Sequence, residues 1–124
     1  MVSEKTVLCI EDNFHNRLLV NRILSSHGYT VIEAKDGVEG LEMIRSLKPP
    51  LVLLDIDLPG MDGIEVVGHI RADDLIRDIP VIALTASAMQ GDRERFLHAG
   101  CDDYLSKPIQ VTQLLDMIAR YYPG

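Results

Sequence analysis

The sequence predicts an α/β fold in which helices cover both faces of a parallel five-stranded sheet. Short apolar runs rich in β-branched residues alternate five times with segments whose apolar residues recur at helical spacing. Runs such as LVLLD at 51–55 are apolar almost throughout, which is typical of parallel strands buried on both faces. Parallel neighbours need crossover connections, and the intervening helical segments supply them.

The predicted strands are short runs that precede each helical segment. TVLCI at 6–10 has the length and composition of a buried strand, whereas DYLS at 103–106 is a weak strand. We expect the five strands at residues 6–10, 29–34, 51–55, 79–85 and 103–106.

The predicted helices have recognisable ends. Gly28 and Gly100 are expected to end the first and fourth helices, and Pro49 with Pro50 closes the second. Asp36, with a glutamate three residues later, forms a capping-box pattern.

The residues expected to face the core are Phe14, Leu18, Leu19, Ile23 and Leu24 in the first helix, Val38, Leu41, Ile44 and Leu47 in the second, Ile64, Val67 and Ile70 in the third, Met89, Arg93, Phe96 and Leu97 in the fourth, and Val111, Leu114, Leu115, Ile118, Ala119 and Tyr122 in the fifth.

Composition narrows the class of protein. The chain has 124 residues, 47% of them hydrophobic and 25% charged, which fits one globular domain over residues 1–124. No segment resembles a signal peptide or a membrane span, so we expect a cytoplasmic protein without membrane insertion. A net charge of −7 argues against direct binding of nucleic acid. Cys9 and Cys101 lack metal-ligand spacing and are interpreted as buried hydrophobic residues.

Polar side chains follow the predicted strands at the point where each strand ends. Glu11 and Asp12 follow the first strand, and Asp55 ends the third. Thr85 ends the fourth strand and Lys107 follows the fifth. In parallel α/β sheets, ligands bind beyond the carboxyl ends of the strands, where the strand order reverses. We therefore expect these five side chains to lie together.

Each of these residues also has a plainer interpretation. Asp12 or Asn13 would serve as a helix cap, as would Thr85 or Ser87, and Lys107 would be a solvated loop charge. Asp55 is harder to explain in this way, because a carboxylate against an apolar strand is costly unless it is paired or bound to a metal. The placement of all five residues at strand ends is therefore more informative about function than any one of them alone.

The chemistry of the acids indicates a magnesium site. Carboxylates in one crevice repel one another unless a cation neutralises them, and Mg²⁺ favours oxygen ligands such as Glu11, Asp12 and Asp55. Asp55 would then act as a carboxylate nucleophile toward phosphorus and form an acyl phosphate. Lys107 would balance the added charge, and the Thr85 hydroxyl would donate to a phosphoryl oxygen.

With these residues in view, the chain resembles a response-regulator receiver domain of two-component signalling. The resemblance rests on IEDN at 10–13, LLDIDLPGMDG at 53–63, ALTA at 83–86 and YLSKP at 104–108, and it covers essentially the whole chain. It implies a flavodoxin-like, doubly wound (βα)5 sandwich whose parallel five-stranded sheet has the order 2-1-3-4-5.

The resemblance also implies roles for individual residues. Asp55 would be the phosphoacceptor, and Asp12, Asp55 and the backbone carbonyl of Asp57 would bind Mg²⁺ directly, with Mn²⁺ as a substitute. Glu11 would act mainly through metal-bound water. Lys107 would contact the phosphoryl group across a cis bond to Pro108.

The resemblance further implies how the signal leaves the domain. Thr85 and Tyr104 match the family's switch pair: recruitment of the Thr85 hydroxyl to the phosphoryl group would let the Tyr104 ring turn inward and change the surface of the fourth helix, fifth strand and fifth helix. The implied partners are a histidine kinase or histidine phosphotransfer protein, docking near the first helix and Ile109, and a downstream protein target.

Alternatives stay open at this point. A pseudo-receiver that is not phosphorylated would be a binding module with the same fold. A flavodoxin-like cofactor carrier is disfavoured because EDNFHN at 11–16 is acidic and lacks glycine. A magnesium-dependent aspartyl-phosphate phosphatase would pair Asp55 with Asp57, whereas a receiver catalyses its own modification and is not a turnover enzyme.

Two departures from the usual receiver pattern bear on the site. Glu11 is longer than the aspartate often found there, and Asp57 is acidic where many relatives are neutral; with Ser87, Asp57 occupies a position that tunes hydrolysis in the family. No output domain fits in this length, so we expect a stand-alone regulator or a receiver cut from a hybrid kinase or larger regulator.

Overall fold

A computed structural model describes residues 4–86 and 92–122, and within these ranges the chain forms five strands and five helices in strict alternation. The strands are β1 (Thr6–Ile10), β2 (Thr30–Ala34), β3 (Val52–Asp55), β4 (Val81–Thr85) and β5 (Asp103–Ser106). The helices are α1 (Phe14–Ser25), α2 (Gly37–Leu47), α3 (Gly63–Ala72), α4 (Asp92–Ala99) and α5 (Val111–Ala119).

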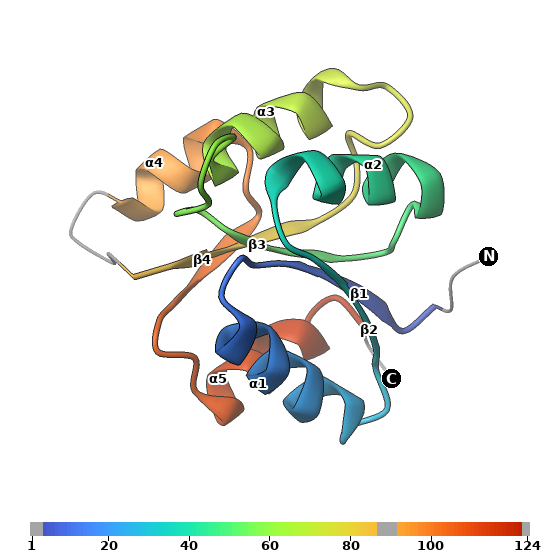
Figure 1. The fold of residues 1–124 in the computed structure, drawn as a ribbon, viewed down its shortest axis with the longest axis vertical. Coiled ribbons are helices and arrows are strands. Elements are labelled where there is room, and N and C mark those ends of the chain that lie inside the picture. The colour runs from blue at the N-terminus through green and yellow to red at the C-terminus, as the bar shows by residue number, and fades with distance from the viewer. Residues whose placement is uncertain (1–3, 87–91, 123–124) are drawn as a thin grey trace.

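The strands form one parallel sheet, as the sequence pattern predicts, and its order β2-β1-β3-β4-β5 is the one that the resemblance implies. Figure 1 shows α1 and α5 on one face of this sheet and α2, α3 and α4 on the other. The strand order reverses between β1 and β3, because β2 lies on one side of β1 and every later strand lies on the other. Among the helices that the structure describes, none is long and apolar enough to cross a bilayer.

Each face of the sheet is covered by a separate hydrophobic core. Leu8, Leu54 and Val67 belong to the core under α2, α3 and α4, and Leu53, Val20 and Leu114 belong to the core under α1 and α5. Alternate residues of the central strands therefore enter opposite cores, which explains why these strands read as continuous apolar runs.

The element boundaries agree closely with the predicted ones. The first and fifth strands match, while β2, β3 and β4 begin one or two residues later than predicted. Asp36 caps α2 as expected, accepting a hydrogen bond of 2.8 Å from the Glu39 N–H. Gly28 adopts a φ of 87° just after α1, a conformation that favours glycine. Both cysteines are buried, as predicted.

The predicted helix faces are partly wrong. Several residues expected in the core are exposed: Phe14, Leu19, Val38, Leu47, Arg93, Leu97, Val111 and Ala119. Phe14, Val38 and Val111 lie in the first turns of their helices, where fewer neighbours cover a side chain. In α1 the buried face contains Arg17 and Val20 in place of Phe14 and Leu19. Met89 lies outside the described residues.

Candidate functional site

The parallel register brings the predicted polar residues to one edge of the sheet. Ile10 pairs with Leu54, Asp55 with Leu84, and Thr85 with Ser106. The residues that end or follow these strands are therefore nearly level with one another. Their chain positions differ by up to 96 residues (Glu11 to Lys107), so only the sheet topology unites them.

Asp55 is held rigidly at the end of β3. Its side chain is buried, with the residue only 2% exposed. One carboxylate oxygen, Oδ1, accepts a hydrogen bond of 2.9 Å from the Asp57 N–H, and the other, Oδ2, lies 3.1 Å from Lys107 Nζ. The carboxylate therefore has a fixed direction and a neighbouring positive charge.

Close packing behind Asp55 depends on a glycine. A Cβ atom on Gly63 would lie 2.7 Å from the Asp55 carbonyl oxygen and 2.6 Å from Ile56 Cα. These are backbone atoms, which cannot move aside without moving the strand end. Gly63 thus lets α3 begin directly against β3, and its N–H donates to the Ile56 carbonyl at 3.1 Å.

Glu11 is the second buried acid, with 1% exposure. Its Oε1 accepts hydrogen bonds from the Asn13 N–H at 3.2 Å and from Asn16 Nδ2 at 3.4 Å. Its Oε2 lies 2.9 Å from Lys107 Nζ. Lys107 therefore bridges the carboxylates of Glu11 and Asp55, which excludes the interpretation of Lys107 as a solvated loop charge.

Asp12 completes the acidic cluster. Ligand oxygens of Glu11, Asp12 and Asp55 all lie within 4.8 Å of one another, and Asp12 is exposed to solvent. Such a set of carboxylate oxygens fits Mg²⁺, which takes one or two carboxylates and keeps several waters. Asn13, not Asp12, caps α1, because its side chain accepts a hydrogen bond of 3.0 Å from the Asn16 N–H.

The electrostatics of the cluster follow from burial and crowding. Burial raises the pKa of Asp55 to about 6, and the charge of Glu11 adds to this effect, while the Asp57 N–H and Lys107 oppose it. Burial lowers the pKa of Lys107, but its hydrogen bond with Glu11 and the charge of Asp55 outweigh burial and leave that pKa raised. The site thus contains more negative charge than its lysine balances, which favours binding of a cation.

The predicted switch residues lie on the two strands beyond β3. Thr85 is buried at the end of β4, and its carbonyl accepts a hydrogen bond of 2.7 Å from the Lys107 N–H. Tyr104 is half-buried in β5, beside Ala83 of β4, and its ring centroid lies 6.1 Å from that of Phe96 in α4. The Lys107–Pro108 peptide is cis, as the resemblance implies. Ser87 lies outside the described residues.

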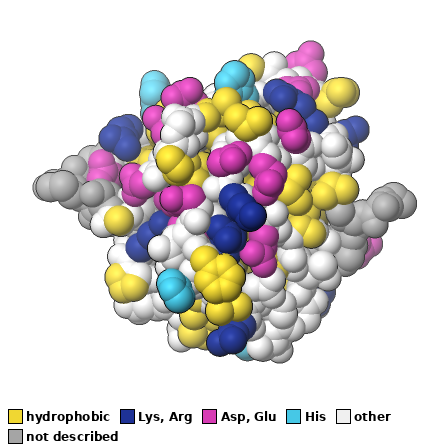
Figure 2. Space-filling model, in the orientation of Figure 1, with side chains coloured by type: hydrophobic (Ala, Val, Ile, Leu, Met, Phe, Trp, Pro, Cys, Tyr) yellow, Lys and Arg dark blue, Asp and Glu magenta, His cyan; other side chains and the backbone are white. Residues whose placement is uncertain are grey.

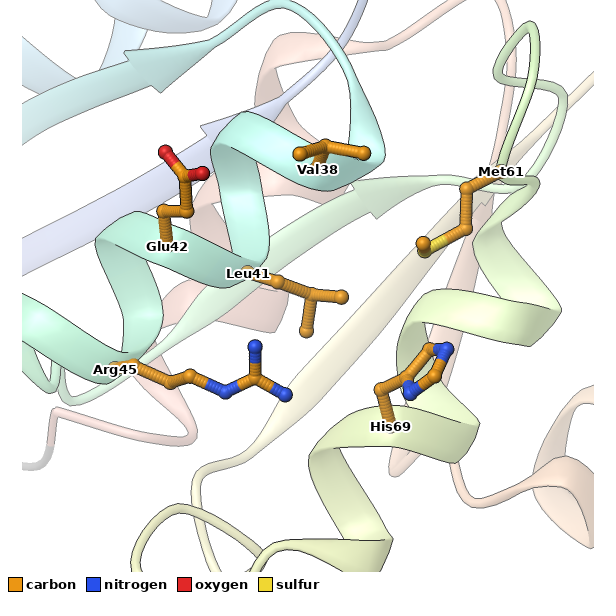
Figure 3. Close-up of a pocket in the computed structure, with 6 residues that line it drawn as sticks. All are labelled: Val38, Leu41, Glu42, Arg45, Met61 and His69. Carbon is orange, nitrogen blue, oxygen red and sulfur yellow. The ribbon is translucent and has the colours of Figure 1, made fainter.

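The face of the molecule drawn in Figure 2 is mixed in charge. Figure 2 shows Asp and Glu side chains across the middle of the face in view, with Lys and Arg side chains between them. A separate pocket of about 210 Å³ lies between α2 and α3, and Leu41, Arg45, Met61 and His69 point into it (Figure 3). None of its lining residues belongs to the acidic cluster.

Sequence reasoning missed two residues that contact the site. Asn16 donates a hydrogen bond to the Glu11 carboxylate, and Arg17 donates to the backbone carbonyl oxygens of Glu11 and Asp12. An asparagine or arginine one turn into a helix normally indicates a solvated face, so the sequence carries no signal for either role.

The fold and the acidic edge resemble those of solved CheY-like domains. The structure superimposes on the Vibrio cholerae chemotaxis protein CheY4 with a TM-score of 0.89 at 26% identity, covering 96% of this chain and 99% of that chain. The receiver domain of a sensor histidine kinase from Pseudomonas aeruginosa, solved with a magnesium ion coordinated in its active site cleft, gives a TM-score of 0.88 at 36% identity, covering 98% of this chain and 100% of that chain.

The sequence comparisons identify the family. The response regulator receiver domain family matches residues 7–119, and the polar-differentiation response regulator DivK of Brucella anthropi is 43% identical over 117 residues, covering 94% of this chain and 95% of that protein. The chain belongs to the response regulator receiver domain family of two-component signalling. Members of this family bind Mg²⁺ in an acidic pocket, interact with histidine kinases and downstream targets, and are signalling proteins rather than turnover enzymes.

Proposed function

We propose that this chain is the phosphoacceptor of a phosphorelay, taking a phosphoryl group onto Asp55 from a histidine kinase or histidine phosphotransfer protein. The observation that carries this proposal is the buried Asp55 carboxylate 3.1 Å from Lys107 and within 4.8 Å of two further acids. A carboxylate held in this way has the orientation and the nearby cation that nucleophilic attack on a phosphoryl group requires.

The donor set supports Mg²⁺ as the cofactor, with Mn²⁺ as a substitute. Asp12, Asp55 and the Asp57 carbonyl would hold the ion directly and Glu11 through water, and the ion would supply positive charge to the phosphoryl oxygens. Glu11 is already engaged by Asn13, Asn16 and Lys107, which suits an indirect role. Asp12 is exposed and has room for a ligand.

In the transfer step, a carboxylate oxygen of Asp55 forms a bond to phosphorus as the P–N bond of the donor phosphohistidine breaks. The electron pair of the P–N bond stays on the ring nitrogen, and the ring, protonated on its other nitrogen, leaves as neutral imidazole. Lys107 would balance the negative charge that the phosphoryl group adds, because its ammonium group already lies between Glu11 and Asp55.

The signal would leave the site through Thr85 and Tyr104. Thr85 lies one strand from Asp55, so its hydroxyl is suited to donate to the phosphoryl oxygens. Tyr104 lies one strand further and contacts Phe96, so movement of its ring would alter α4, β5 and α5, where a downstream target would bind. Phosphorylation shifts this equilibrium only by its different interaction with the two states.

The experiment is intact-mass analysis after incubation with acetyl phosphate and Mg²⁺, beside Asp55→Asn and an EDTA control. We expect a single phosphoryl adduct that needs Mg²⁺ and is absent from Asp55→Asn. A folded wild-type protein without an adduct would contradict the proposal and favour a pseudo-receiver. Many turnovers of a free phosphate ester would instead favour a phosphatase that pairs Asp55 with Asp57.

A further inference from the structure

A second cation, Arg17, lies buried beside the acidic site but is directed at different atoms. Arg17 is on the inward face of α1 with only 9% exposure, which is unusual for an arginine. Its Nη1 donates to the carbonyl oxygens of Glu11 at 2.8 Å and Asp12 at 3.0 Å. The guanidinium therefore clamps the two consecutive peptide groups that carry these acids.

The charge of Arg17 is balanced away from the acidic cluster. Its Nε lies 3.3 Å from Glu33 Oε1, and the other oxygen of Glu33 accepts a hydrogen bond of 2.8 Å from Asn21. Lys107, by contrast, places its ammonium group directly on the carboxylates of Glu11 and Asp55. Because Arg17 is paired with Glu33, it does not occupy the carboxylate oxygens that a metal ion would use.

Asp12 is the acid that depends most on this clamp. The Glu11 side chain is fixed by its own hydrogen bonds and by Lys107, and the Asp55 side chain by Asp57 and Lys107. Within the described residues, the Asp12 side chain makes no hydrogen bond or ion pair. Asp12 is therefore held through its backbone, and Arg17 is the side chain that binds the Asp12 carbonyl.

We propose that Arg17 is a positioning residue, which orients the Glu11–Asp12 backbone so that the Asp12 carboxylate faces the cation site. This inference rests on the proposed function, because it takes Mg²⁺ to be the ligand of the cluster. Partners that orient metal ligands without touching the metal typically contribute 10- to 100-fold in affinity. Arginine suits this role because its planar fork of five donors reaches two carbonyls and a carboxylate at once.

The test measures Mg²⁺ binding by calorimetric titration of the unphosphorylated protein. Arg17→Met keeps the apolar stem and removes every donor, and we expect it to weaken Mg²⁺ affinity about tenfold or more. Arg17→Lys keeps the charge but not the fork and should give an intermediate loss; it also keeps the test valid if Arg17→Met does not fold. In EDTA, amide NMR signals of residues 11–13 should shift in Arg17→Met, which reports on the backbone without any metal.

The control is Arg71→Met, because Arg71 has the same kind of contacts at a distance from the site. Arg71 donates to the carbonyls of Gly100, Arg77 and Ile79 and pairs with Asp102 at 2.9 Å. Its loss should lower stability but leave Mg²⁺ affinity within about twofold of wild type, since it contacts no residue of the acidic cluster.

The outcomes separate this inference from the proposed function. If wild type binds Mg²⁺ and forms the adduct, while Arg17→Met binds Mg²⁺ within twofold of wild type, only the inference is overturned. The inference also fails if Arg71→Met loses as much affinity as Arg17→Met. If wild type binds no Mg²⁺, both the proposed function and the inference are wrong.

Discussion

Strand β3 contains two regions with opposite effects on stability. Val52, Leu53 and Leu54 are fully buried and alternate between the two cores of the molecule. Asp55, the next residue, is almost as buried but carries a carboxylate beside two further acids. Burial of the apolar residues stabilises the fold, whereas burial of the acid opposes folding unless a cation is bound. The strand thus fixes the position of the Asp55 carboxylate by embedding the neighbouring residues in the core.

Replacing a core residue of β3 should have the largest effect. Leu53→Ala leaves a cavity at a fully buried position under α1 and α5, and we expect a loss of about 3 kcal/mol in the free energy of unfolding. Urea titration followed by circular dichroism measures this loss. A loss below about 1 kcal/mol would mean that this side of the sheet is not closely packed.

Substitution at the start of α3 tests the junction between the two regions. Gly63→Ala places a methyl group against backbone atoms of Asp55 and Ile56, so we expect a loss of about 1–3 kcal/mol and weaker Mg²⁺ binding.

Gly68→Ala in the same helix is the matched control for this junction. It meets no atom within 4 Å and should instead stabilise the protein by about 0.5–1 kcal/mol, since alanine favours a helix more than glycine does. Equal effects of the two substitutions in urea titrations would show that the close contact behind Asp55 is unimportant.

Removing the charge at the end of β3 should raise the free energy of unfolding, whereas the core substitution lowers it. In EDTA at pH 7.5, Asp55→Asn should raise the free energy of unfolding by about 1–2 kcal/mol, because the buried carboxylate is destabilising. Its pKa of about 6 in the folded protein exceeds the ordinary value of 3.8, so the folded state binds this proton more tightly than the unfolded chain.

The pH dependence of this difference provides its check. Protonation of Asp55 favours folding of the wild-type protein. The stability that this proton contributes is complete below about pH 4 and is lost as the pH rises through about 6. The advantage of Asp55→Asn over wild type should therefore shrink as the pH falls from 7.5 to 4.5. An advantage that stays constant over this range would contradict the raised pKa. Saturating Mg²⁺ should stabilise wild type selectively.

The sequence predicts the strands and the residues at their ends better than it predicts which helix residues are buried. Strand runs and helical spacing predict a parallel five-stranded sheet, and the resemblance to receiver domains implies its strand order. The rule for strand ends then predicts that Glu11, Asp55 and Lys107 lie together. Side-chain periodicity does not fix how each helix is rotated on the sheet, because a stripe of apolar residues is compatible with several rotations. The buried place in α1 that an apolar residue was expected to fill is taken by Arg17, whose role depends on carbonyl groups that no sequence pattern marks.

The smallest effect on stability is expected for substitution of Phe14. This residue was predicted to face the core, but it is 61% exposed in the structure. Its ring lies 5.9 Å from the Arg17 guanidinium carbon, a contact of modest strength at an exposed site. Phe14→Ser should therefore change the free energy of unfolding by less than about 1 kcal/mol, whereas loss of a buried phenylalanine costs about 3–5 kcal/mol. Urea titration separates these values clearly. A loss near the larger figure would mean that α1 is rotated from its described position, which would also move Arg17 away from the carbonyls of Glu11 and Asp12.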